Sequence, residues 1–246
     1  GNVMIKLEKN STVLFYGDSI THGGRLNSMD GNHVIGHGYQ EMLSARMGFE
    51  NLENMPKFIN KGVSGDAVCQ LYGRLTADVL KYKPDMISIL AGVNDIYRGF
   101  GLPHGMTTDK FIAVYRMMIN DIRTVLGDPT IIICEPFYLD YKKPEDSYKN
   151  TPYVVCESPF YPGYFLTSND EIEDFSRKEM RYMQSELKKL VIDSGCIFVP
   201  LQEEFDKAAE KVSPEYLIWD TVHPTVVGHE IIARKWYEVV DGVLGK

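Results

Sequence analysis

The sequence lacks any apolar run that approaches the roughly 18–20 residues needed to cross a bilayer. The stretch from Gly1 to Asn10 also lacks the basic and then apolar segment that marks an export signal. Together these two absences favour a cytoplasmic location and argue against insertion into a membrane. A leader peptide removed ahead of Gly1 stays open as an alternative.

The sequence has fewer positive than negative side chains. It contains 26 Lys and Arg and 34 Asp and Glu residues, which gives a formal net charge of −8. Non-specific binding to nucleic acid or to an anionic membrane needs a positive field, so neither is an expected partner. The composition, 44% hydrophobic and 24% charged, is that of a globular protein and excludes a disordered or coiled-coil chain. A length of 246 residues without an internal repeat suits one α/β domain over residues 1–246.

The chain is also poor in candidate metal ligands and redox pairs. Its four cysteines have none of the short spacings of zinc or redox motifs, so reduced thiols are expected. His33 and His37 have a spacing that can bind metal, but Gly36 and Gly38 argue against a regular helix there. No metal site is therefore predicted.

Five short and nearly continuous apolar runs are typical of parallel strands covered on both faces. They span residues 13–17, 58–60, 86–91, 130–135 and 196–200. Segments with a helical apolar period lie between and after them, at 39–47, 67–82, 110–126, 171–192 and 225–240. The fourth of these follows a capping-box pattern, Ser168-x-x-Glu171. This alternation predicts a doubly wound parallel sheet with right-handed crossovers.

Polar blocks follow the first three predicted strands, and another stands near the C-terminus. In sheets of this kind, ligands bind beyond the carboxyl ends of the strands. The blocks are Gly-Asp-Ser-Ile-Thr at 17–21, Asn-Lys-Gly-Val-Ser-Gly-Asp at 60–66, Gly-Val-Asn-Asp at 92–95 and Asp-Thr-Val-His-Pro at 220–224. Each block is weak by itself, but their order and their places at strand ends together indicate one site.

These blocks contain the groups that serine-based acyl transfer needs. A serine hydroxyl such as that of Ser19 becomes a good nucleophile only when a nearby base takes its proton, and His223 can be that base. Asp220, three residues earlier, can fix the tautomer of the imidazole and stabilise its charged form. The backbone N–H groups of Ser19 and Gly65 and the side-chain amide of Asn94 can supply an oxyanion hole.

Simpler interpretations exist for several of these residues. Ser19 could merely cap the helix that follows it, since serine is a favoured N-cap. Ser64 is a rival nucleophile, but it lacks the sharp strand-to-helix context. Asp18 is expected to hold a turn through its carboxylate, and Asp95 is expected to be a turn residue.

The four blocks resemble those of the SGNH hydrolase family, also called the GDSL esterase/lipase family. The resemblance runs from Val13 to about Val240 and departs from the name motif only at Ile20, where that motif has leucine. It implies a flavodoxin-like three-layer α/β/α sandwich with a five-stranded parallel sheet. It also implies that no metal or organic cofactor is needed.

The resemblance assigns roles residue by residue. It implies Ser19 as the nucleophile, with Asp220 and His223 completing a catalytic triad. It implies Gly65 and Asn94 as oxyanion donors beside the amide of Ser19. The family does not fix the substrate, because its members cleave acetylated sugars, lipids, thioesters and simple esters.

A long insert follows the fourth predicted strand. Residues 136–167 show no clear helical or strand period and are rich in aromatic side chains and proline. They could form a lid or wall over the cleft, or pack onto the core or a subunit interface. Their place beyond a strand end favours substrate contact. The candidate contact residues are His22, beside the nucleophile, and Tyr138, Phe160 and Tyr161 in the insert.

The expected function is therefore that of a serine esterase on small esters, with acetyl groups on carbohydrate as the favoured substrate. A lipase, a lysophospholipase or a thioesterase of the same family is an alternative. Two alternatives from other classes are a flavin-binding module and a catalytically inactive carbohydrate-binding relative. The flavin module would give no role to Asn94, Asp220 or His223. The oligomeric state is left open.

Overall fold

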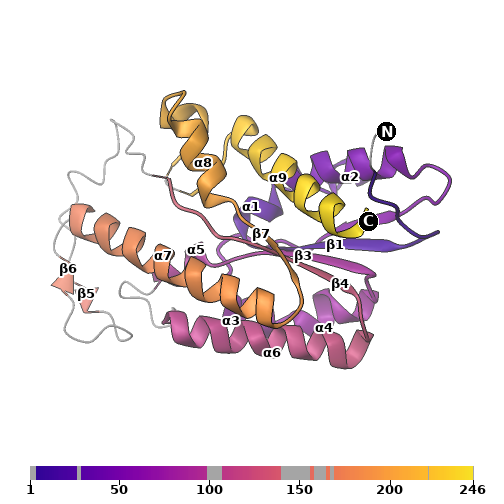
Figure 1. Ribbon diagram of the computed structural model, residues 1–246, viewed down its shortest axis with the longest axis horizontal. Helices are drawn as coiled ribbons and strands as arrows, with labels where there is room; N and C mark the ends of the chain where they lie inside the picture. Colours follow the sequence, from indigo (N-terminus) through magenta and orange to yellow (C-terminus); the bar gives the residue numbers. More distant parts are fainter. Residues whose placement is uncertain are drawn as a thin grey trace.

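A parallel sheet lies at the centre of the molecule (Figure 1). The computed structural model describes residues 4–26, 29–98, 107–139, 156–157, 165–166, 169–220 and 222–245. Five strands pair in the order β2-β1-β3-β4-β7. Their bounds are Lys57–Asn60 for β2, Thr12–Gly17 for β1, Met86–Leu90 for β3, Thr130–Cys134 for β4 and Ile197–Val199 for β7. The predicted strands are confirmed, each to within one residue at either end.

The register brings the carboxyl ends of four strands to one edge of the sheet. Gly17 at the end of β1 pairs with Leu90 of β3, and Leu90 pairs with Cys134 of β4. Cys134 in turn pairs with Val199 of β7. The polar block after β1 and the block after β3 therefore begin side by side.

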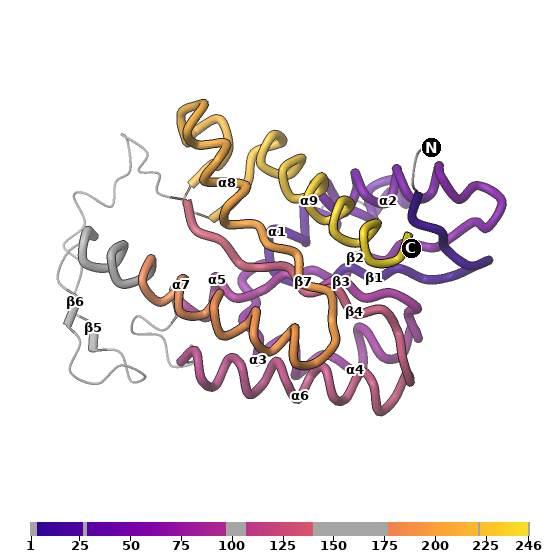
Figure 2. The backbone as a smooth tube through the Cα atoms, viewed as in Figure 1, coloured from indigo at the N-terminus to yellow at the C-terminus, as the bar shows by residue number. Residues whose placement is uncertain are grey.

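Helices cover both faces of the sheet, so the three-layer α/β/α sandwich is confirmed (Figures 1 and 2). On one face lie α2 (Tyr39–Glu50), α8 (Gln202–Ala209) and α9 (Val226–Leu244). On the other lie α3 (Val68–Gly73), α4 (Leu75–Asp78), α6 (Thr108–Leu126) and α7 (Asn169–Asp193). The short helices α1 (Ser19–His22) and α5 (Val93–Arg98) follow β1 and β3 directly.

Smaller elements complete the chain. Single 3₁₀ turns occur at Gly31–His33, Leu80–Tyr82 and Pro214–Tyr216. A two-stranded antiparallel ribbon of β5 (Cys156–Glu157) and β6 (Phe165–Leu166) lies within the insert, where no strand was predicted.

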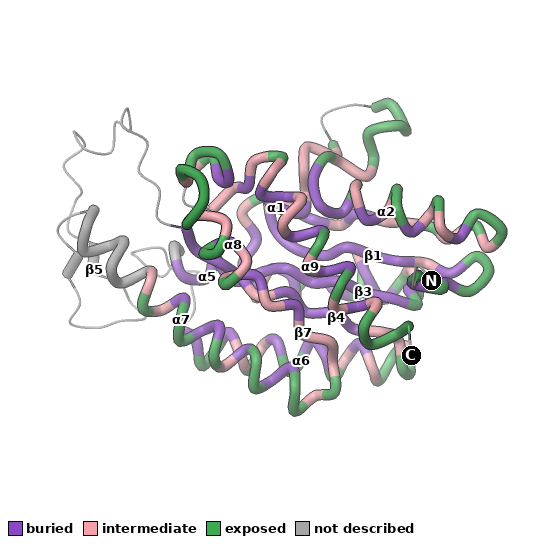
Figure 3. The backbone as a smooth tube through the Cα atoms, turned by 45° about the horizontal axis from the view of Figure 1, so that its top comes forward, coloured by how far each residue is buried: buried purple, intermediate pink, exposed green. Residues whose placement is uncertain are grey.

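Each face of the sheet has its own apolar core, because successive strand residues point to opposite faces. Leu14, Tyr16 and Ile89 pack with α3, α6 and α7, whereas Phe15 packs with α2 and α9. The central strands β1, β3 and β4 are almost entirely buried, and most exposed residues lie on the outer surfaces of the helices and in loops (Figure 3). Fully buried Trp236 of α9 closes the second core, and its indole N–H donates to Ser88 Oγ on β3 at 2.9 Å.

The prediction of one continuous helix over residues 67–82 is wrong. It is divided into α3, α4 and a 3₁₀ turn, and Arg74 between α3 and α4 has φ −110° and ψ 11°. The Arg74 guanidinium donates to the backbone carbonyls of Gly17 and Lys61. Such long-range anchoring is invisible in the helical period of the sequence.

Helix α8 was not predicted at all. Its apolar face is short, because Phe205 is its only buried residue and only Ala208 and Ala209 join it against the core. Its start is held from another element, since Glu135 accepts hydrogen bonds from the backbone N–H groups of Leu201 and Gln202. At the start of α7, the predicted capping residue Ser168 lies outside the described residues.

Candidate active site

The turn after β1 presents Ser19 at the start of a very short helix. Asp18 occupies the N-cap of α1, where its Oδ1 accepts the Ile20 N–H at 3.0 Å. The predicted turn-holding role of Asp18 is confirmed. The alternative in which Ser19 caps this helix is wrong, because Ser19 is its first residue.

Ser19, His223 and Asp220 form one hydrogen-bonded chain. Ser19 Oγ lies 2.7 Å from His223 Nε2, and His223 Nδ1 lies 2.7 Å from Asp220 Oδ2. All three side chains are half-buried. A hydroxyl, an imidazole and a carboxylate in this sequence allow a proton to pass from the serine to a ring that the carboxylate orients.

The loop that carries Asp220 and His223 is closed by backbone pairing at its base. Ile218 and Pro224 form an antiparallel bridge, and the Trp219 N–H donates to the His223 carbonyl at 2.8 Å. Inside the loop, Asp220 Oδ1 accepts the N–H groups of Val222 and His223, each at 2.7 Å. This local turn holds the carboxylate and the imidazole in contact.

Hydrogen bonding separates the pKa values of the two ionisable groups in the chain. Burial by itself would raise the pKa of Asp220, but hydrogen bonds from the His223 ring and from two backbone N–H groups outweigh it and hold the pKa below its usual value. The hydrogen bond to Asp220 raises the pKa of His223 above 6.5, against the opposing effect of burial. Asp220 therefore stays ionised beside an imidazole that is a stronger base than a free one.

Asp18 is a second carboxyl group close to this site. It is 1% exposed, and burial raises its pKa to about 7. Its charge raises the pKa of His223, but this is the smallest of the effects on the pKa of that ring.

The two remaining candidate oxyanion donors come from neighbouring segments. Asn94 lies in α5, and its Nδ2 donates to the Asp66 carbonyl at 3.1 Å, next to Gly65. A primary amide has two N–H groups, so one contact leaves the second for a ligand. Gly65 has φ +83°, a conformation that favours glycine. Asp95 was predicted to be a turn residue, but it lies inside α5, where its buried carboxylate accepts the Val68 N–H at the start of α3.

The structure describes two of the four residues that were predicted to contact substrate. His22 Nδ1 accepts the Gly24 N–H at 3.1 Å, and burial lowers the pKa of this ring. Tyr138 is 5% exposed and belongs to the core on the α6 and α7 face, as the packing alternative for the insert expects. Phe160 and Tyr161 lie outside the described residues. Substrate contact at these four positions stays a prediction.

One residue was missed altogether by reasoning from sequence. Arg74 donates to the Gly17 carbonyl and to the Asp66 carboxylate, and so touches two of the polar blocks. A single arginine within a helical period looks like a solvent-facing residue, so no local signal distinguished it.

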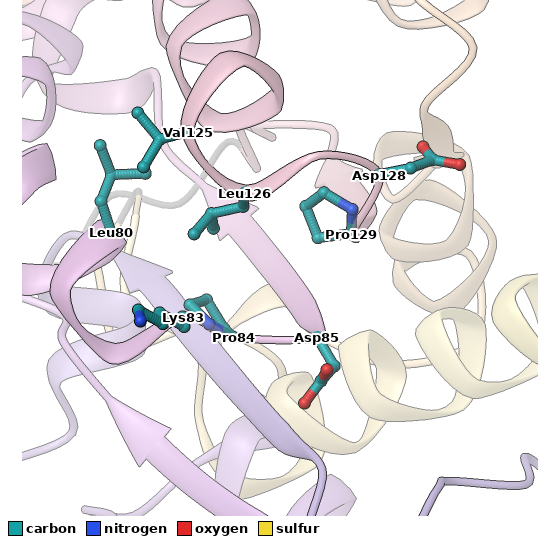
Figure 4. A pocket seen from close by; sticks show the side chains of 8 residues that line it. All are labelled: Leu80, Lys83, Pro84, Asp85, Val125, Leu126, Asp128 and Pro129. Atoms are coloured by element: carbon teal, nitrogen blue, oxygen red, sulfur yellow. The ribbon is translucent and has the colours of Figure 1, made fainter.

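Two hollows lie in the described part of the chain without including Ser19 or His223. A hollow of about 410 Å³ opens at the amino ends of β3 and β4, between residues 80–85 and 125–129 (Figure 4). Another, of about 200 Å³, lies between α7 and α8 and includes Tyr138. Within the described segments, no group of three or more His, Cys, Asp or Glu is arranged to hold a metal ion. Among the helices described, none is both long and apolar enough to cross a membrane.

Comparison with known proteins identifies the family. The profile of the GDSL-like Lipase/Acylhydrolase family matches residues 15–231. The chain belongs to this family. An acetylxylan esterase of Geobacillus stearothermophilus is 28% identical over an alignment of 236 residues that covers 94% of each chain. This member of the GDSL-like family is thus a carboxylic ester hydrolase, as predicted.

Solved structures of related proteins agree with that assignment. A structure from Parabacteroides merdae, designated a GDSL-like lipase, has a TM-score of 0.77 and 28% identity, covering 98% of this chain and 99% of its own. The crystal structure of an acetylxylan esterase from Geobacillus stearothermophilus has a TM-score of 0.73 and 26% identity, covering 95% of both chains. These neighbours have the flavodoxin-like fold described above.

Proposed function

We propose that this GDSL-family hydrolase removes short acyl groups, above all acetyl, from carbohydrate by way of an acyl-enzyme on Ser19. The observation that carries the proposal is the chain of two 2.7 Å contacts from Ser19 Oγ through His223 to Asp220. A family likeness to esterases supports the reaction type, and this geometry supports the choice of residues.

In the proposed reaction, Ser19 Oγ attacks the ester carbonyl while His223 Nε2 takes its proton. The Ser19 and Gly65 N–H groups and the Asn94 amide donate to the oxyanion that forms. His223 then returns the proton to the leaving alcohol, and an acyl-enzyme remains. Water attacks that ester with His223 again acting as base, which releases the acid and restores Ser19. Asp220 orients the ring and stabilises its protonated form in both halves.

The choice of acetyl esters on carbohydrate draws on a relative. The curated protein that matches along 94% of this chain is named an acetylxylan esterase. The aromatic composition of residues 136–167 is also suited to stacking against sugar rings. We further propose that residues 1–246 form a single domain, because the five parallel strands described belong to one sheet.

The test of the nucleophile compares two serines. Ser19→Ala should lower kcat for p-nitrophenyl acetate by at least about 10⁴-fold and abolish covalent labelling by a fluorophosphonate. Ser64→Ala is the matched control, because Ser64 is exposed and lies in the neighbouring polar block. It should retain both activity and labelling. Ester turnover that survives in Ser19→Ala would overturn the assignment.

The test of the substrate uses acyl chains of two lengths and then natural esters. We expect p-nitrophenyl acetate to be hydrolysed with a much higher kcat/KM than p-nitrophenyl octanoate. Acetylated xylooligosaccharides should release acetate at a rate that depends on Ser19. Preference for octanoate would reject the acetyl-sugar proposal and favour lipids or long acyl thioesters, whereas an active-site label without turnover would indicate a different alcohol component.

A further inference from the structure

Arg74 is a largely buried arginine whose guanidinium is surrounded by acceptors. Its side chain is 17% exposed. Nε donates to Asp66 Oδ2 at 2.7 Å, and Nη1 donates to the Lys61 carbonyl at 2.7 Å and to Asp78 Oδ2 at 2.9 Å. Nη2 donates to the Gly17 carbonyl at 3.2 Å. Four of the five N–H groups that a guanidinium offers are therefore engaged.

These acceptors are distributed over the elements that hold the proposed oxyanion donors. Gly17 ends β1 and lies two residues before Ser19. The Lys61 carbonyl and the Asp66 carboxylate bracket the segment that contains Gly65. The Asp66 carbonyl accepts the side-chain amide of Asn94 at 3.1 Å. One side chain thus connects, directly or through Asp66, the segments that carry Ser19 and Gly65 and the side-chain amide of Asn94.

We propose that Arg74 is a positioning residue that sets the spacing of the Ser19, Gly65 and Asn94 donors around the developing oxyanion. This inference rests on the proposed function, because it assumes that these three groups form the oxyanion hole. Arg74 has no place among the reacting atoms in this proposal. It acts through Gly17, Lys61 and Asp66.

The chemistry of the contacts requires a guanidinium. Three of the acceptors lie in different directions around one planar group, and a lysine ammonium is a point charge on a flexible stem that cannot reproduce this fork. The guanidinium carbon also lies 4.4 Å from the centre of the Tyr16 ring, which fixes the plane of the group against β1. Arg74 is outside both α3 and α4, so the break between these helices is what lets its side chain reach the strand ends.

A residue that only positions the oxyanion donors should affect the stability of the transition state and leave substrate binding unchanged. Oxyanion donors bind charge that develops during reaction, so their displacement lowers kcat without weakening ground-state binding. Displacement of a reacting geometry by about 1 Å can cost about 100-fold in rate. We therefore expect Arg74→Lys and Arg74→Ala to lower kcat for p-nitrophenyl acetate by roughly 10- to 100-fold, with KM changed less than about threefold.

The matched control is Arg46→Ala. Arg46 also pairs with a carboxylate, Glu50, and also lies over an aromatic ring, that of Tyr237. It is on α2, and its partners are not part of the proposed site. Loss of the same kind of contacts at Arg46 should leave kcat and KM within about twofold of the parent enzyme. All assays are made well below the unfolding temperature of each variant, as measured by thermal denaturation.

Two further measurements separate positioning from general stabilisation. In an Asn94→Ala background, Arg74→Lys should lower kcat much less than it does in the parent, because part of what it positions is already gone. Inactivation by a fluorophosphonate should slow in parallel with kcat, since its tetrahedral product uses the same donors. If Arg74→Ala is too unstable to purify, Arg74→Lys and Asp66→Asn carry the test, because both keep a side chain of similar size.

The outcomes distinguish this inference from the proposed function. A parent enzyme without Ser19-dependent esterase activity would overturn the proposed function itself. With an active parent, Arg74 variants that lower the unfolding temperature but keep full kcat would show a purely structural role and overturn the inference. A rise in KM at constant kcat would place Arg74 in substrate binding and overturn it as well.

Discussion

Asp220 contacts His223 twice, with a different carboxylate oxygen each time. Oδ1 accepts the backbone N–H of His223 and Oδ2 faces its ring Nδ1, and both distances are 2.7 Å. One side chain therefore fixes both the position of the His223 backbone and the orientation of its ring. The Ile218–Pro224 bridge closes the base of the loop that carries both residues.

The double contact predicts that Asp220→Asn will be folded and nearly inactive. An asparagine oxygen can still accept the two backbone N–H groups, so the turn and the unfolding temperature should change little. Its amide N–H₂ cannot accept from Nδ1, so the ring is driven to the tautomer with no lone pair on Nε2 for the serine proton. We expect kcat to fall by about 10³- to 10⁴-fold, measured on p-nitrophenyl acetate. A variant that retained more than a tenth of the parent kcat would contradict this account of the site.

The raised pKa of His223 predicts the acid side of the pH profile. Only the neutral imidazole can accept the proton of Ser19, so kcat/KM should rise with pH and reach a plateau once His223 is deprotonated. Because the hydrogen bond to Asp220 raises this pKa, the midpoint should lie above 6.5. Initial rates between pH 5 and 9 test this, and a rate that is flat from pH 5 to 8 would exclude a histidine base.

Buried Asp18 predicts a pH dependence of stability rather than of catalysis. Its pKa is about 7 in the folded protein and near 3.8 when solvated, so the folded state holds a proton that the unfolded state loses between these values. The free energy of unfolding should accordingly fall as pH rises through this window, by an amount on the order of a few kcal/mol. Asp18→Asn keeps the oxygen that caps α1 but removes the titration, so its unfolding temperature should decline less between pH 4 and 8.

The control for that experiment is Asp128→Asn, which changes an exposed carboxyl in the turn before β4. Its unfolding temperature should follow the parent at every pH. Parallel curves for Asp18→Asn and the parent would mean that Asp18 is charged in the folded protein at neutral pH, contrary to the expectation.

The parts of the fold that depend on short-range pattern were predictable. A buried parallel strand needs apolar side chains on both faces, so Met86–Leu90 and Thr130–Cys134 are recognisable without any knowledge of their neighbours. Similarly, the polar residues at the strand ends could be assigned to one site because a parallel sheet brings those ends together. Ser19, Gly65 and Asn94 were found in this way, whereas Asp220 and His223 were recognised by their short spacing near the C-terminus.

The parts that depend on distant partners were not predictable. The break at Arg74 follows from carbonyl acceptors on other segments, and α8 begins where Glu135 from β4's end accepts its first N–H groups. Each of these features is settled by contacts between segments far apart in the chain.

The wide separation of Ser19 and His223 along the chain, 204 residues, has a consequence during protein synthesis. At about 5–20 residues per second, a ribosome needs roughly 10–40 s to add the histidine after the serine has been made. Throughout that interval the nascent polypeptide carries a serine with no base to activate it. If Ser19 and His223 act as proposed, the enzyme is therefore inert until its C-terminal segment has been made and has folded against Ser19.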